Sequence, residues 1–188
     1  MVVTFGDGAS NTGSFHEAAN LAATWQLPVV LVCQNNRYAE MTPASHTMRV
    51  ERIADRAVAY AMPGTQTDGN DPVAVADALA AAVARARAGQ GPTLLECLTY
   101  RFNGHFFGDP MAYIPKEELQ EAIAADPVPR FRARLLAEGT LDETRLTAID
   151  AEAERTVEEA LQDVLAGPPP GLDELERDVY ATNVGVPR

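Results

Sequence analysis

The residues best suited to chemistry stand where two apolar runs end. Gly6-Asp7-Gly8 places a carboxylate in a tight turn, and flanking glycines let the backbone approach a ligand closely. The second run is followed by Asn36 and Tyr38. Magnesium takes about six oxygen ligands in near-octahedral geometry and usually shares them with a phosphate-bearing molecule. Asp7, the amide oxygen of Asn36 and the Tyr38 carbonyl would supply part of that set.

Main-chain groups beside this carboxylate are suited to an anion. The backbone N–H groups of Gly8 and Ala9 stand near a predicted helix start, where they would face a phosphate. A structural turn with a solvated aspartate explains Gly-Asp-Gly alone equally well, and the spacing to Asn36 favours the metal and diphosphate site. The chain has no G-x-x-x-x-G-K-[ST], and its glycines do not match G-x-G-x-x-G. A nucleotide-binding domain of the ATP or nicotinamide type is therefore the weaker alternative.

His105 is a third candidate, in a polar segment after another apolar run. Histidine titrates near neutral pH and can move protons or steady charge on a substrate carboxylate or an enolate-like intermediate. A lone histidine beside a glycine is otherwise a surface loop residue. Its residue type and position alone favour the surface-loop interpretation over a catalytic one.

Two strands and a helix must position the first two candidates. Val2–Phe5 and Pro28–Gln34 are apolar runs typical of buried strands. The segment between them has helical spacing, and Ser14 and Glu17 stand at capping-box distance. A strand, helix and strand in this order predict a right-handed βαβ unit with parallel strands.

The elements that follow extend this pattern. We expect helices over Arg49–Tyr60 and, after Asp71, over 72–88, and a buried strand over Thr93–Tyr100. Alternating strands and helices predict the α/β class with a doubly wound, mostly parallel sheet. Ligands of such sheets bind beyond the carboxyl ends of the strands, where Asp7, Asn36 and His105 all fall.

The chain divides by composition into three predicted parts. Residues 1–110 form the α/β core that binds diphosphate and magnesium. Residues 111–167 form a C-terminal helical region, and residues 168–188 form a proline-rich turn and a tail. The amphipathic, charge-rich helices of the middle part are expected over 116–125, 128–138 and 142–165.

Charge and cysteine usage exclude several classes. The 188 residues carry 15 basic and 27 acidic side chains, a formal net charge of −12, which would repel nucleic acid. The apolar runs are too short to span a membrane, and no charged segment precedes an apolar one at the start. Cys33 and Cys97 lie inside apolar runs without a C-x-x-C motif, which indicates buried free thiols. We expect a cytoplasmic protein.

The stretch GDGASNTGSFHEAANLAATWQLPVVLVCQNNRYAEMTP, residues 6–43, resembles one family closely. A Gly-Asp-Gly followed by an apolar strand and Asn-Asn looks like the thiamine diphosphate signature. The segments DGNDP, GPTLLE, YRFNGHFFGDP and DVYA are also similar to this family. The chain is thus similar, over nearly its whole length, to the α subunit of the E1 component of 2-oxo acid dehydrogenases of the pyruvate and acetoin type.

The resemblance implies a thiamine diphosphate-binding fold, thiamine diphosphate with Mg²⁺ as cofactors, and roles for named residues. Asp7, Asn36 and the Tyr38 carbonyl would bind magnesium. His105 matches the loop histidine near the cofactor's reactive carbon and would be catalytic. The residues expected to contact the cofactor are Gly6, Asp7, Gly8, Ala9, Asn36 and His105. The implied reaction is oxidative decarboxylation of a 2-oxo acid, or acetoin cleavage, with acyl transfer to a lipoyl group.

The resemblance also implies partners. In this family a glutamate of the β subunit activates the cofactor, so a β-type E1 subunit is expected, in an α2β2 heterotetramer, with a lipoyl-bearing E2 component beyond it. Family α subunits carry a long region ahead of the Gly-Asp-Gly strand, and this chain is expected to lack it. The alternative is a non-catalytic truncated remnant or fragment that keeps the fold and the subunit contacts.

Overall fold

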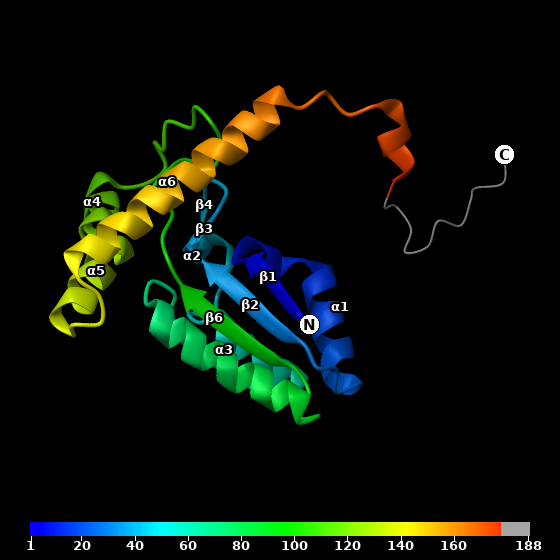
Figure 1. Cartoon of the computed structure of the whole chain (residues 1–188). Helices are drawn as coiled ribbons and strands as arrows, with labels where there is room; N and C mark the ends of the chain where they lie inside the picture. The colour runs from blue at the N-terminus through cyan, green and yellow to red at the C-terminus, as the bar shows by residue number, and fades with distance from the viewer. Residues whose placement is uncertain (178–188) are drawn as a thin grey trace. The chain divides into compact units, whose positions relative to one another are not determined.

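A computed structural model of the chain describes residues 1–177 and is built on one parallel sheet (Figure 1). Its four strands lie in the order β1-β2-β6-β5, and every neighbouring pair is parallel. The strands are β1 (Val2–Gly6), β2 (Val30–Asn35), β5 (Gly64–Asp68) and β6 (Thr93–Leu98). The predicted α/β class with a mostly parallel sheet is confirmed.

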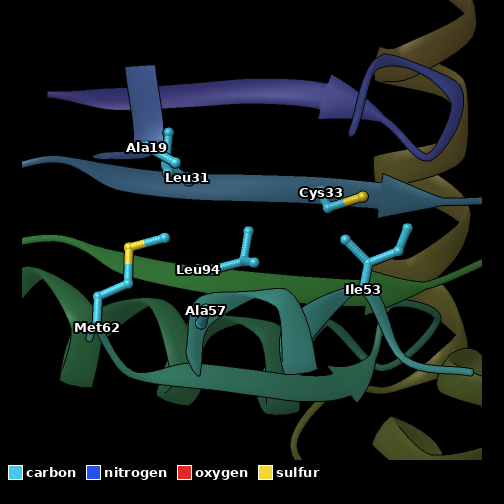
Figure 2. Close-up of a cluster of buried hydrophobic side chains, with 7 residues drawn as sticks. All are labelled: Ala19, Leu31, Cys33, Ile53, Ala57, Met62 and Leu94. Carbon is cyan, nitrogen blue, oxygen red and sulfur yellow. The ribbon is translucent and has the colours of Figure 1, made fainter. Parts of the chain in front are cut away.

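Helices cover both faces of the sheet, as a doubly wound fold requires (Figure 1). Leu31 and Cys33 of β2 pack on one face against α1 (Gly13–Thr24) and the 3-10 helix η2 (Ile53–Tyr60). Figure 2 shows this cluster, which comprises Ala19, Leu31, Cys33, Ile53, Ala57, Met62 and Leu94. The alternate residues of β2 pack on the other face against α3 (Pro72–Arg87) in a cluster of Val30, Val32, Ala82, Leu95 and Cys97.

The start and end of α3 follow from the residues predicted to set them. The Asp71 carboxylate accepts hydrogen bonds from the N–H groups of Val73 (2.9 Å) and Ala74 (3.2 Å). Pro72 occupies the first helical position, where its missing N–H is not needed. Beyond the helix, Gly89 has a φ of +72°, a left-handed conformation that glycine adopts without strain.

The structure between α1 and α3 differs from the prediction in two places. No single helix runs over 49–60: the short α2 (Ala44–Thr47) comes first, Arg52 is extended, and η2 follows. The buried Glu96 carboxylate accepts the Ala54 N–H at 3.0 Å, so a contact from another strand sets the start of η2. The strand β5 is also missing from the prediction, because its sequence GTQTD has no apolar alternation.

The predicted cap of the first helix is also wrong. The N-cap of α1 is Thr12, whose side-chain oxygen accepts the Phe15 N–H at 3.4 Å, whereas Ser14 lies inside the helix. The 3-10 helix η1 (Gly8–Asn11) occupies the segment before it. A cap at Ser14 would start the helix at Phe15, whereas α1 starts two residues earlier, at Gly13, directly after η1 and the cap residue Thr12.

The C-terminal helices are present within one residue of their predicted bounds. They are α4 (Lys116–Ala124), α5 (Pro127–Ala137) and α6 (Glu143–Ala166), followed by the 3-10 helix η3 (Leu172–Glu176). The chain forms two compact units, residues 1–133 and residues from 134 onward. The three-part division stays a prediction, and DVYA (178–181) lies outside the described residues. Over residues 1–177, no helix combines the length and apolar character needed to cross a bilayer.

Candidate functional site

The sheet register brings the first two candidate segments together. Gly6, the last residue of β1, pairs with Gln34 of β2, so Asp7 follows one strand just where Asn36 follows the next. The N–H groups of Gly8 and Asn36 lie close enough to the Asp7 carboxylate to lower its pKa. The structure therefore places Asp7, Gly8 and Asn36 in one site at the carboxyl edge of the sheet.

Asp7 is an unusually placed carboxylate. Its residue is 2% exposed, and its Oδ2 atom is buried without a hydrogen-bond partner among residues 1–177. Burial raises the pKa of this carboxyl, opposed by its own N–H and by the positive charge of Arg101. A buried acceptor without a partner is costly. An added donor or cation at this oxygen would offset that cost.

A sharp turn holds the other two predicted ligands. The Asn36 side-chain oxygen accepts the Tyr38 N–H at 3.0 Å, and Arg37 between them has a φ of +69°. The amide oxygen has a second lone pair that remains available. The short strands β3 (Tyr38–Ala39) and β4 (Thr42–Pro43) form a hairpin. The Ala44 N–H donates a hydrogen bond to the Arg37 carbonyl and closes this hairpin. Pro43 is paired with Tyr38 in this hairpin. Because proline has no N–H, Pro43 cannot donate a hydrogen bond to the Tyr38 carbonyl.

The glycines that flank Asp7 have different surroundings. A Cβ atom on Gly8 would lie 2.6 Å from the Cβ of Ala39, so packing inside the chain already requires a glycine there. A Cβ atom on Gly6 would meet nothing within 4 Å. Contacts within the described chain therefore leave the glycine at Gly6 unexplained.

His105 lies in a hydrogen-bonded loop at the same edge. Its N–H donates to Asp109 Oδ2 at 2.8 Å, and its Nδ1 lies 3.1 Å from Arg101 Nη1. Arg101 Nη2 donates to the Glu40 carbonyl (2.7 Å) and to the Tyr113 hydroxyl (3.0 Å), which itself donates to Asp109 (2.7 Å). The positive charge of the same guanidinium also lowers the pKa of the Asp7 carboxyl, against the larger effect of burial. Arg101 thus connects the histidine loop to the proposed metal site.

The Asp109 carboxylate is the acceptor on which this loop closes. Hydrogen bonds from the N–H groups of Met111 and His105, and from the Tyr113 hydroxyl, hold the pKa of Asp109 below its usual range. A Cβ atom on Gly104 would lie 2.5 Å from the Asp109 Cβ, so the loop needs a glycine at that position. Arg101 and Asp109 both lie in the segment YRFNGHFFGDP that carries the resemblance, but their roles depend on contacts within the loop and were not predicted.

A buried carboxylate that was not predicted from the sequence lies beneath the site. Glu96 of β6 is fully buried and accepts hydrogen bonds from Asn35 Nδ2 (2.7 Å), the Ala54 N–H (3.0 Å) and Gln66 Nε2 (3.1 Å). It thereby fixes Asn35, the neighbour of Asn36. A glutamate inside the apolar run TLLECL was the signal that could have revealed it.

A second missed residue is Glu118 of α4. The hydroxyls of Tyr38 and Tyr100 both donate to Glu118 Oε1 at 2.9 Å. Burial, then the bond to Glu118 and its charge, raise the pKa of Tyr38 to about 12. A cavity of about 600 Å³, lined by Arg37, Tyr38 and Glu118 among others, opens beside this contact. It has the size of a small-molecule site.

Comparison with known proteins shows the family. The dehydrogenase E1 component family matches residues 1–172. The chain is 45% identical, over 96% of its length, to the α subunit of acetoin:2,6-dichlorophenolindophenol oxidoreductase of Bacillus subtilis, and covers 54% of that protein. It is 42% identical over 91% of its length to the B. subtilis 2-oxoisovalerate dehydrogenase α subunit, covering 53% of it.

A human relative agrees with these two. The chain is 37% identical, over 95% of its length, to the somatic mitochondrial α subunit of the pyruvate dehydrogenase E1 component, of which it covers 46%. The chain therefore spans about half the length of the curated relatives it matches. Sequence match, relatives and parallel α/β fold agree, and the chain belongs to the dehydrogenase E1 component family, among the α subunits of 2-oxo acid dehydrogenases.

Proposed function

We propose that this chain supplies the magnesium- and diphosphate-binding part of a thiamine diphosphate site. The observation that carries the proposal is the Asp7 Oδ2 atom, buried and without a hydrogen-bond partner among residues 1–177, beside Asn36 at the carboxyl edge of the sheet. A hard cation is the natural partner of such an oxygen. The residues present therefore fit the ion.

The donor set suits magnesium shared with a phosphate. Within the described residues, no three His, Cys, Asp or Glu side chains gather around one point. A cation at Asp7 would thus take further ligands from the Asn36 amide oxygen, the Tyr38 carbonyl and the diphosphate. Magnesium commonly binds through one or two carboxylates and substrate phosphates in this way.

The remaining predicted residues have positional roles. The backbone at Gly6, Gly8 and Ala9 would lie against the diphosphate, where a side chain on Gly6 would reduce the approach. When bound, thiamine diphosphate supplies the carbon nucleophile that makes decarboxylation of a 2-oxo acid possible. His105 would bind the negatively charged group of the substrate. The loop around Arg101 and Asp109 would hold His105 in place.

The reaction we propose is oxidative decarboxylation of a 2-oxo acid, or acetoin cleavage, with acyl transfer to lipoyl. The names of the relatives support it, since they act on acetoin, 2-oxoisovalerate and pyruvate and are called α subunits. We propose a β-type E1 subunit in an α2β2 heterotetramer and a lipoyl-bearing E2 component as partners. The cytoplasmic location and the exclusion of nucleic acid and membrane stay predictions from composition.

A second candidate is a remnant that keeps the fold and the subunit contacts without completing a site. The chain covers 54% and 53% of the lengths of the two B. subtilis relatives, so the share of the site that it supplies by itself is what the experiment must measure. The two candidates differ in cofactor binding and in activity with a partner.

Calorimetric titration tests the proposal. Thiamine diphosphate is titrated into the chain with magnesium, without magnesium, and with a β subunit of an acetoin or 2-oxo acid dehydrogenase. We expect magnesium-dependent binding that Asp7→Asn weakens about 100-fold or more, since even outer-shell changes at metal sites cost 10–100-fold. The matched control Asp77→Asn, on the exposed side of α3, should bind normally.

Each outcome decides between the candidates. Equal affinity in Asp7→Asn and the unaltered chain would overturn the metal assignment. Binding that requires the β subunit would support the proposal with the site at a subunit interface. Decarboxylation on mixing with the β subunit would exclude the remnant, and no binding under any condition would favour it.

A further inference from the structure

His105 has a donor beside one ring nitrogen and an acceptor near the other. Arg101 Nη1 lies 3.1 Å from Nδ1, and the Glu40 carboxylate oxygen Oε1 lies 3.9 Å from Nε2. The His105 backbone is fixed as well, because its N–H donates to Asp109. The charged and titratable groups that the structure places around the loop are Arg101, Glu40, Asp109 and Tyr113.

The two contacts place the ring proton. A guanidinium has only donors and stays charged in proteins, so the hydrogen bond from Arg101 needs an unprotonated Nδ1. A neutral imidazole carries one proton, which must then be on Nε2. A carboxylate accepts and does not donate when ionised, so Glu40 favours a proton on Nε2 as well. Two neighbours on opposite sides of the ring select the same tautomer.

We infer that Arg101 is a positioning residue that holds His105 as the Nε2–H tautomer, so that His105 presents a hydrogen-bond donor at Nε2. A proton taken up by the neutral ring would have to bind Nδ1, where the Arg101 N–H already points. Loss of the single Nε2 proton would leave an imidazolate anion. While the contact with Arg101 persists, Nδ1 is the hydrogen-bond acceptor of the ring and Nε2–H is its donor.

The surrounding contacts make Arg101 suited to this role. Its Nη2 is held by the Glu40 carbonyl (2.7 Å) and the Tyr113 hydroxyl (3.0 Å), so its Nη1 is left to face the histidine. Tyr113 is itself bonded to Asp109, the acceptor of the His105 N–H. One closed set of hydrogen bonds thus fixes both the arginine and the histidine backbone.

This tautomer defines the ligand that the histidine would meet. An Nε2–H group binds an anionic or carbonyl oxygen, such as the carboxylate of a 2-oxo acid or an oxygen that gains negative charge during reaction. The Glu40 side chain is 77% exposed and can turn away to admit such a group. Only this last step, the meeting of His105 with substrate, rests on the proposed function.

Nitrogen NMR of the full chain tests the inference without substrate or cofactor. When histidine is labelled at its ring nitrogens, the nitrogen chemical shift distinguishes a protonated from an unprotonated nitrogen. The chemical shift of an Nδ1 that accepts a hydrogen bond also differs from that of an Nδ1 without one. The chain has three histidines, and His105→Gln identifies the signal of interest. We expect an unprotonated, hydrogen-bonded Nδ1 for His105 and a free Nδ1 for the exposed His46.

Variants separate positioning from general loop disorder. Arg101→Met should move the His105 Nδ1 signal toward that of His46, and Arg101→Lys should restore part of the shift. Glu40→Gln should leave the Nδ1 signal in place, because it alters only the Nε2 side. A protonated Nδ1 in the unaltered chain would overturn the inference, and so would an unmoved signal in Arg101→Met.

The result is independent of the proposed function. If Nδ1 behaves as expected and no thiamine diphosphate binds, the proposed function fails and the role of Arg101 stands. If magnesium-dependent binding is found but Nδ1 carries the proton, the role of Arg101 fails and the proposed function stands.

Discussion

Gly6 and Gly8 flank the same aspartate and serve different purposes. A Cβ atom on Gly8 would clash with Ala39 at 2.6 Å, whereas one on Gly6 has open space. Packing within the chain explains the first glycine, and only close approach of a ligand or another chain would explain the second. The pair therefore separates a folding requirement from a binding requirement at neighbouring positions.

We expect Gly8→Ala to lower the free energy of unfolding by about 1–3 kcal/mol, the usual cost of overpacking. Gly6→Ala should change it by less than about 0.5 kcal/mol and yet weaken magnesium-dependent binding of thiamine diphosphate. Urea unfolding and calorimetric titration of both variants measure the two effects. Normal cofactor affinity in Gly6→Ala would contradict the assignment of Gly6 to the cofactor site.

The buried thiol of Cys33 gives a pH dependence. Burial, then the nearby charges of Glu96 and Asp7, raise its pKa from 9.0 to about 12. The folded chain therefore holds this proton more tightly than the unfolded chain. The resulting stability is complete below the unfolded value and is lost as the pH rises from about 9 toward 12.

Between about pH 8 and about pH 11, the urea midpoint of unfolding should thus decrease more in the unaltered chain than in Cys33→Ala. The variant creates a small cavity, so its midpoint is lower at about pH 8, and the comparison is of the change in midpoint between the two pH values. Cys97, whose pKa burial also raises, contributes equally to both chains. Identical changes in midpoint would show that Cys33 ionises as freely in the folded chain as in the unfolded one.

At the scale of elements, Glu96 joins parts of the chain that are distant in sequence. Its carboxylate receives hydrogen bonds from the end of β2, the start of η2 and the edge strand β5. Leaving a buried donor without an acceptor costs about 1–3 kcal/mol. The geometry of the carboxyl edge thus depends on one side chain below it.

Glu96→Ala should lower the free energy of unfolding by about 3 kcal/mol or more, because three donors lose their acceptor. Glu96→Gln keeps the volume and one acceptor oxygen, so about half that loss is expected. Denaturant unfolding measures both, with Glu152→Ala on the exposed face of α6 as a control that should stay within about 0.5 kcal/mol. A Glu96→Ala chain as stable as this control would refute the proposed structural role.

The elements that could be predicted are those whose own residues determine them. β1, β2 and β6 follow from apolar runs, and α3 from Asp71, Pro72 and Gly89. β5 could not be predicted, because GTQTD is a strand only through pairing with β6. η2 depends on Glu96, and the start of α1 depends on the preceding η1. Predictions failed where a distant contact, rather than a local pattern, decides the structure.

The same distinction applies to the site over the whole molecule. The βαβ pattern predicts the adjacency of Asp7 and Asn36, and the register confirms it. The roles of Arg101 and Glu118 could not be predicted, since each depends on hydrogen bonds between segments whose relative placement is not encoded in a local pattern. The proposed ligand roles themselves await the titrations described above.

At the scale of the whole molecule, the sheet has an open edge at β1 among residues 1–177. β1 and β5 are its two outer strands, and Val2 and Val3 of β1 are 49% and 39% exposed. Open, apolar edge strands promote association between chains, and a lysine on the edge opposes it. We expect the isolated chain to self-associate with increasing concentration, measured by sedimentation velocity, and Val3→Lys to reduce this association.

Val58→Lys is the matched control, because Val58 is 81% exposed on η2 and lies outside the sheet. It should associate as the unaltered chain does. Equal association of all three chains would mean that another surface is responsible.

The alternation of β2 between its two hydrophobic clusters has a further consequence. Leu31 and Val32 point to opposite faces, so a shift of β2 by one residue would exchange the two cores. The same shift would move Asn36 by about 3.3 Å along the strand relative to Asp7. Packing of the two cores therefore fixes the register of β2, and this register sets the spacing of the proposed metal ligands. Selection for cofactor affinity would then act on aliphatic side chains that never touch a ligand.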